Sequence, residues 1–201
     1  MDRLATPAIL ITRDGYWISG AVSTHGRRLL DLLNDCSRPQ VRLQDVEISV
    51  EPTFTRSSRR QEAVIQKEKL GLAILAQKGH ESAEKRWDNY TPKRRCRVGV
   101  LALGLEIEGD LHLESSAGNI QNALVSTPGN FLPLTQVKIS PMDAEGKPFQ
   151  VGVVLVNKEA ITLLGKVERQ TPRSWNIEQA KPFVLSDRIL SEEPSPAPRI
   201  V

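Results

Sequence analysis

The stretch LLDLLNDCSRPQVRLQDVEIS (Leu29–Ser49) is the most informative part of the chain, because a second version of it, IQNALVSTPGNFLPLTQVKIS (Ile120–Ser140), follows later in the sequence. The two stretches align without a gap at an offset of 91 positions. The matched pairs are Leu29/Ile120, Leu33/Leu124, Val41/Leu132, Leu43/Leu134, Val46/Val137, Ile48/Ile139 and Ser49/Ser140. We therefore expect two copies of one small domain.

The repeat extends outward on both sides of these stretches. Downstream, VIQKEKL (Val64–Leu70) falls on LVNKEAI (Leu155–Ile161) at the same offset of 91. Upstream the offset becomes 89, as in the pair Gly20/Gly109, which requires a difference of only two residues in one loop. Domains of about 70 residues bury only about 60% of their unfolded surface, so the two copies are expected to pack against one another.

Each copy is predicted to begin with two antiparallel strands. In the first copy, β-branched and aromatic runs at residues 8–14 and 16–22 flank Asp14-Gly15, which is a hairpin turn signal. In the second copy, residues 98–113 alternate between an apolar and a polar face. The apolar face carries Leu103, Leu105, Ile107, Leu111 and Leu113, and the polar face carries Glu106, Glu108, Asp110 and His112.

A short amphipathic helix is expected next, because Leu29, Leu32 and Leu33 have helical spacing. Its counterpart is Gly118–Val125, after the N-cap candidates Ser115 and Ser116. Strands at residues 40–50 and 131–139 follow, then strands at 63–70 and 151–156, and finally a short apolar run at 161–164. Both copies thus have the order β-β-α-β-β-β.

The predicted fold class is mainly β with short helices. We expect a tandem duplication of a small β-barrel-like domain, Sm-like or SH3-like in architecture only, whose helix closes one open end. The expected organisation is a first domain at residues 5–76, a basic linker at 77–95, a second domain at 96–168 and a proline-rich, partly disordered tail at 169–201.

Composition indicates an ordinary soluble protein. The 201 residues are 39% hydrophobic and 25% charged, with no run of about 20 apolar residues and no signal-peptide core after Met1. We expect a cytoplasmic location. Cys36 and Cys96 are not repeat equivalents and lack metal-ligand spacing, so no zinc site or disulfide framework is indicated. The histidines His25, His80 and His112 lie far apart in sequence, and no metal or cofactor is expected.

No catalytic motif is evident, and we expect a protein that is not an enzyme. Glu106, Glu108 and Asp110 could in principle do acid–base work as a small hydrolase. On a strand of period two, such residues more simply keep an exposed face polar. The matched Lys67-Glu68 and Lys158-Glu159 are interpreted in the same structural way, as a turn or helix cap.

Basic residues concentrate in the middle of the chain. Residues 56–97 hold 12 Lys and Arg against 5 Asp and Glu, whereas the remainder holds 15 against 19. The candidate partner-binding or polyanion-binding residues are Arg56, Arg59, Arg60, Lys93, Arg94, Arg95 and Arg97, with Trp87 and Tyr90 beside them. Cations neutralise phosphates and aromatic rings stack on bases, which suits single-stranded nucleic acid. The same charges could bind an acidic protein surface or an anionic membrane face.

The second copy resembles an uncharacterised bacterial family of small β-rich domains. The resemblance rests on Ile107–Gly109, Phe131–Ile139 and Val154–Ile161, and Arg28–Asn34 carries the family's helix motif in the first copy. It implies a fold and supplies no activity. The first copy departs from the pattern at Gln66, where the second has Asn157, so a function tied to that position would be confined to one copy.

These observations favour a non-enzymatic adaptor or structural subunit of a larger bacterial assembly. It would bind protein partners through sheet edges, the basic linker and the tail. The alternative is a nucleic-acid-binding protein that uses residues 56–97.

Overall fold

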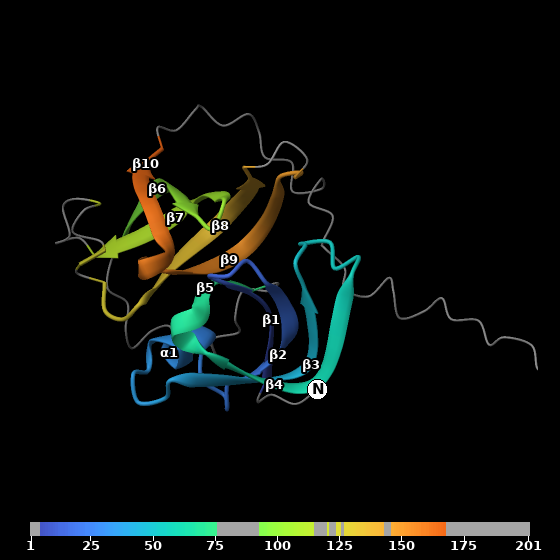
Figure 1. Cartoon of the computed structure of the whole chain (residues 1–201). Helices are drawn as coiled ribbons and strands as arrows, with labels where there is room; N and C mark the ends of the chain where they lie inside the picture. The colour runs from blue at the N-terminus through green and yellow to red at the C-terminus, as the bar shows by residue number, and fades with distance from the viewer. Residues whose placement is uncertain are drawn as a thin grey trace, which may run out of the picture. The chain divides into compact units, whose positions relative to one another are not determined.

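The chain forms an antiparallel β structure in the computed structural model, which describes residues 5–75, 93–114, 120, 124–125, 127–142 and 146–167 (Figure 1). The first copy consists of β1 (Ala5–Thr12), β2 (Trp17–Ser23), α1 (Leu29–Asn34), β3 (Gln40–Ser49), β4 (Ser57–Gln66), the 3-10 turn η1 (Lys67–Lys69) and β5 (Leu70–Leu75). The second consists of β6 (Lys93–Ala102), β7 (Leu105–Glu114), β8 (Phe131–Pro141), β9 (Phe149–Asn157), η2 (Lys158–Ala160) and β10 (Ile161–Lys166).

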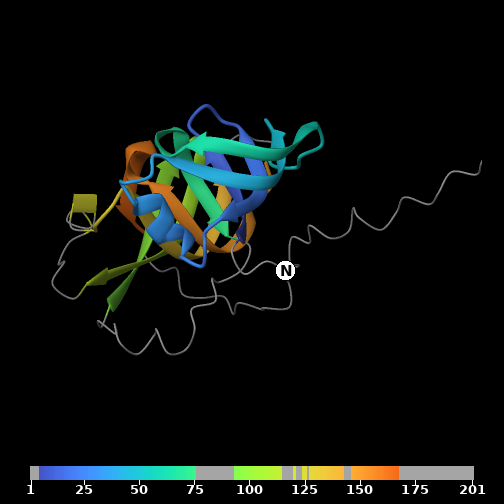
Figure 2. The same cartoon turned by 90° about the horizontal axis from the view of Figure 1, so that it is seen from below.

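The strands of both copies belong to one ten-stranded sheet in the order β10-β6-β7-β8-β9-β5-β1-β2-β3-β4. Within each copy the order is the same, β5-β1-β2-β3-β4 and β10-β6-β7-β8-β9, and the two sets meet where β5 pairs with β9 (Figures 1 and 2). The prediction of a mainly β chain is confirmed. The prediction that each copy closes into its own barrel is wrong. Each five-stranded set has one unpaired edge strand, and its other edge pairs with the other set through β5 and β9.

A matched β-bulge shows how closely the two copies correspond. Asp45 and Gln136, which are 91 positions apart, both have a φ of 51°, and the strand register shifts opposite each of them. The facing residues are Gly20 and Gly109, where an added Cβ would lie 3.0 Å from the Gln44 carbonyl oxygen and from Leu134 Cβ respectively. Glycine fits both places because the bulge brings the neighbouring strand so close that a side chain would be tightly packed against it.

The apolar faces of the sheet enclose two hydrophobic clusters, and each cluster takes residues from both copies. Leu43, Leu134 and Ile139 are buried as their pattern predicts, and Ile48 is half-buried. Every residue of β5 is buried, because its two faces contribute to different clusters. The two copies therefore share their cores and are not separate globules.

Helix α1 lies over the cluster that is built mainly from first-copy residues. Its Leu29, Leu32 and Leu33 are buried, as the helical spacing predicts. Most of the predicted second helix, Gly118–Val125, lies outside the described residues, although Leu124 packs half-buried against the other cluster. Linker residues 77–92 and tail residues 169–201 also lie outside the described part, and β6 already begins at Lys93. Among the described residues, no helix is long and apolar enough to cross a membrane.

Candidate interaction surfaces: the repeat junction and the two open edges

Among the described strands, the two copies share a strand ladder only where β5 pairs with β9. Four residue pairs form it in antiparallel register, from Leu72 opposite Val156 to Leu75 opposite Val153. Leu72 and Ile74 face one cluster while Ala73 and Leu75 face the other. The ladder therefore has apolar side chains packed on both of its faces, which makes it a permanent junction and not a loose contact.

Asn34, the last residue of α1, joins the first copy to the start of β8. Its Nδ2 donates to the Phe131 carbonyl at 3.3 Å, and its Oδ1 accepts from the Phe131 N–H at 2.8 Å. Gly129 lies against the Asn34 side chain so closely that a Cβ there would be 2.3 Å from Asn34 Cγ. These contacts place the Phe131 ring, which belongs to the second copy, inside the cluster beneath α1.

Asn157 performs a similar role at the end of β9. Its side chain is 3% exposed, its Nδ2 donates to the Leu70 carbonyl at 2.7 Å, and its Oδ1 accepts from the Glu159 N–H at 3.1 Å. Glu159 in turn pairs with Arg13 from the β1–β2 turn at 2.5 Å, but both side chains are solvent-accessible and the pair adds little stability. The asparagine that distinguishes the second copy from Gln66 is thus a junction residue.

Aromatic packing closes the same junction from β2. The rings of Trp17 and Phe149 lie 6.5 Å apart with an interplanar angle of 56°, a tilted arrangement that aromatic pairs favour. Trp17 is buried in the cluster that is otherwise built mainly from second-copy residues. A ladder, two asparagines and an aromatic pair therefore hold the copies together.

The strands equivalent to β9 and β5, namely β4 and β10, form the two open edges of the sheet. Only Ile65 is buried in β4, and no residue of β10 is buried. Each edge nevertheless carries an exposed apolar side chain, Val64 at 57% and Leu163 at 52%. Edge strands present unpaired backbone N–H and C=O groups that another strand can use, so both edges are candidate binding surfaces.

The structure divides the predicted basic residues between the two ends of the sheet. Arg56 is exposed before β4, and Arg59 and Arg60 are exposed on β4, which is the edge strand of the first copy. Lys93, Arg94 and Arg95 lie on β6, next to the opposite edge, and no strand pairing joins β4 to β6. Trp87 and Tyr90 lie outside the described residues, so a binding surface shared by all of these side chains stays a prediction.

Arg97 has a different environment from the other predicted basic residues. Its guanidinium donates to Asp110 Oδ1 at 3.3 Å and to the Gln136 carbonyl at 2.9 Å, and it lies 3.9 Å from Glu108. It therefore stabilises the bulge at Gln136 and neutralises two residues of the acidic strand face. Glu108 and Asp110, two of the three carboxylates considered for acid–base chemistry, are therefore engaged in a structural network.

The matched lysines close the turns after β4 and β9. Lys67 Nζ donates to the carbonyls of Leu32 and Asp35 at the end of α1, and Lys158 Nζ donates to the Thr127 carbonyl at 2.6 Å. Burial lowers the pKa of both lysines, because desolvation disfavours their charged form. The prediction of a structural turn or cap at these positions is confirmed.

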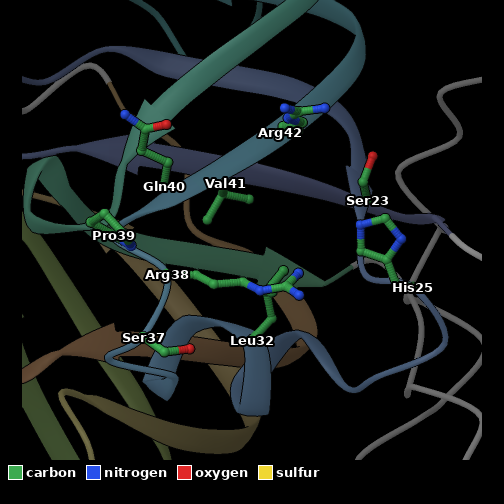
Figure 3. Close-up of a pocket in the computed structure, with 9 residues that line it drawn as sticks. All are labelled: Ser23, His25, Leu32, Ser37, Arg38, Pro39, Gln40, Val41 and Arg42. Atoms are coloured by element: carbon green, nitrogen blue, oxygen red, sulfur yellow. The ribbon is translucent and has the colours of Figure 1, made fainter.

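A hollow of about 450 Å³ lies between α1, the α1–β3 connection and β3 (Figure 3). Its polar lining includes Ser23, His25, Arg38 and Arg42, and Figure 3 shows the Arg38 guanidinium extending toward His25. The three cationic or basic groups could hold an anion by hydrogen bonds. The lining contains no carboxylate or thiol to serve with His25 in nucleophilic or metal chemistry.

The described residues contain no group of three or more His, Cys, Asp or Glu that could hold a metal ion. Comparison with protein-family models, with curated proteins and with solved structures finds no match to this chain.

The junction residues Asn34, Phe131 and Asn157 were not singled out as site residues from the sequence. They could have been found from the positions where the two copies carry residues of different size or polarity. Phe131 corresponds to Gln40, Asn157 to Gln66 and Trp17 to Glu106. In each pair the residue at the junction is buried and its equivalent is exposed, so a contrast between repeats marks the interface.

Proposed function

We propose that the chain is a non-enzymatic structural or adaptor subunit that binds protein partners by strand addition at its two open edges, β4 and β10. The observation that carries the proposal is the β5·β9 junction, where the equivalent edges of the same module already pair with each other. A module whose edges bind one another inside a chain has the geometry needed to accept a strand from outside.

Two features of the edges support this role. Each edge exposes an apolar side chain, Val64 or Leu163, although a strand that only had to remain soluble would be expected to carry polar groups there. The edges also carry charged side chains, with Arg59, Arg60 and Glu62 on β4 and Lys166 on β10. Partner strands would thus be selected by backbone pairing together with side-chain charge.

The test uses the full chain and two edge variants, Val64→Lys and Leu163→Lys, with Val50→Lys as a matched control. Val50 is also exposed, at 66%, but lies beyond the end of β3, outside either edge strand. Complexes purified from the native source should lose partners in one or both edge variants and retain them in the control. Retained complexes should also show slowed hydrogen exchange in β4 or β10. Partners that remain bound to a protein carrying both edge changes would contradict strand addition.

A second candidate function, binding of single-stranded nucleic acid, is favoured by the exposed Arg94 and Arg95 on β6. Fluorescence anisotropy with a labelled single strand should then show affinity that falls with salt, with a slope of about 0.7 per phosphate contact. Replacing both arginines by Ser should lower that slope and leave the melting temperature unchanged. An affinity that is equal in the variant and the parent would eliminate this reading.

A further inference from the structure

We propose that the strand received by each edge comes from a second copy of this chain, with β10 of one copy paired antiparallel to β4 of the next. The inference rests on the proposed function, because it names the partner of the two edges. The internal junction serves as its template, since β10 is the repeat equivalent of β5 and β4 is the equivalent of β9.

The offset of 91 positions converts the register of β5 with β9 into the register expected for β10 with β4. Leu72 opposite Val156 becomes Leu163 opposite Ile65, and Leu75 opposite Val153 becomes Lys166 opposite Glu62. The two intervening pairs are Leu164 opposite Val64 and Gly165 opposite Ala63. The exposed Val64 would thus gain an apolar partner, and a cation would meet a carboxylate at the end of the ladder.

A hollow beside β10 gives this pairing a second point of contact. It measures about 230 Å³, and its lining includes Gly99, Glu106, Leu163 and Gly165. The strand registers equate Gly99 with Ile9 and Glu106 with Trp17, and the offset of 91 equates Gly165 with Ile74. The hollow therefore exists because three large apolar side chains of the first copy are replaced by two glycines and a carboxylate.

The residue that would enter this hollow follows from the same template. In the internal junction, Phe149 and Val151 pack on the cluster that contains Trp17. Their equivalents on β4 are Ser58 and Arg60, both exposed. An Arg60 side chain from a second copy would lie over Gly99 and Gly165, with its guanidinium near Glu106. An ion pair would then take the place that the Trp17–Phe149 contact has in the internal junction. Two complementary charge pairs, Arg60 with Glu106 and Glu62 with Lys166, then align with one ladder.

The expected association is reversible, unlike the internal junction. The buried anchors Phe131 and Asn157 are Gln40 and Gln66 on the open side, so apolar burial is smaller and charge contributes more. A head-to-tail contact of this kind joins unlike surfaces, so copies add in sequence until a ring closes. The assembly should therefore grow with protein concentration and weaken with salt.

The experiment is analytical ultracentrifugation of the full chain from about 1 µM to about 500 µM at low and high salt, with circular dichroism of each variant as a fold check. Glu62→Lys and Lys166→Glu should each weaken self-association by roughly tenfold or more, because like charges then oppose each other at the interface. Lys147→Glu, an exposed charge reversal on the β8–β9 connection, is the control and should leave assembly unchanged. Mixing the two edge variants should restore assembly, since each edge of one variant then faces a complementary edge of the other.

Each remaining outcome overturns the proposal. A chain that stays monomeric throughout, edge variants that assemble like the parent, or a mixture that fails to recover would all show that β10 does not pair with β4. If the chain is monomeric yet another protein slows hydrogen exchange in β4 or β10, self-pairing fails while strand addition stands. If neither occurs, strand addition fails with it.

Discussion

The inner strand β5 and the outer strand β10 occupy equivalent places in the two copies but have opposite environments. All of β5 is buried between two clusters, whereas β10 has no buried residue. The sequences follow this difference, with Ile74 at the junction and Gly165 at the edge. The two sets of five strands follow the same order. The residues that differ between them are those that have a neighbouring strand in one set and none in the other.

The largest difference in stability is expected between substitutions at the equivalent positions Phe131 and Gln40. Phe131→Ala removes a ring that is 1% exposed in the cluster beneath α1 and should lower the free energy of unfolding by about 3 to 5 kcal/mol. Gln40→Ala, at the equivalent exposed position, should stay within about 0.5 kcal/mol of the parent. Urea denaturation measures both. Equal effects would show that the two positions have similar environments.

The helix leucines give the next largest contrast. Leu33→Ala should cost on the order of 2 to 5 kcal/mol, because the side chain is 3% exposed and closes α1 onto the sheet. Leu124→Ala should cost less, since its side chain is only half-buried. The same denaturation series measures the pair. A Leu33→Ala protein within about 0.5 kcal/mol of the parent would mean that α1 does not cover the core.

Exchanging the side-chain amides at Asn157 and Gln66 should change the stability by a smaller amount. Asn157→Gln should displace the donor from the Leu70 carbonyl and cost about 1 to 3 kcal/mol, the penalty for a buried acceptor that loses its partner. The reverse change, Gln66→Asn, alters an exposed side chain and should have little effect. If Asn157→Gln melts at the temperature of the parent, the hydrogen bond to Leu70 is not a determinant of the junction.

The smallest expected effect is a pH dependence at Asp35, which corresponds to Ser126 in the second copy. Hydrogen bonds from the Ser37 hydroxyl and from Arg27, together with the Ser37 N–H, hold the pKa of Asp35 well below its ordinary value of 3.8. A depressed folded pKa contributes stability above the unfolded pKa, and that contribution is lost as the pH falls through the folded pKa.

Asp35→Ser should therefore be less stable than the parent near neutral pH, and the difference should narrow below about pH 3.8. Urea midpoints measured at neutral and acid pH provide the comparison. If the difference in urea midpoint between the parent and Asp35→Ser is the same at neutral and acid pH, the stabilisation comes from packing and not from the ionised carboxyl.

The strands and the helix could be predicted from patterns that occur in both copies. The junction residues could have been found only from positions where the two copies differ. The hairpin at Asp14-Gly15, helix α1 and the bulge strands follow from alternation, from helical spacing and from matched glycines. Closure of each copy on itself was a wrong inference, because a strand that is apolar on both faces, such as β5, does not reveal which neighbour covers it. The basic residues are close in sequence, but strand order separates β4 from β6, and sequence proximity carries no information about that order.

In the structure, β5 and β9 form a junction that is apolar on both faces, whereas their equivalents β10 and β4 are open edges. Native-state hydrogen exchange on the full chain at low protein concentration tests this difference most directly. Backbone amides at residues 72–75 and 153–156 should exchange only through global unfolding, whereas those at 163–166 and 62–65 should include fast-exchanging positions. Exchange at the junction as fast as at the two edges would contradict the claim and would make the copies two independent domains.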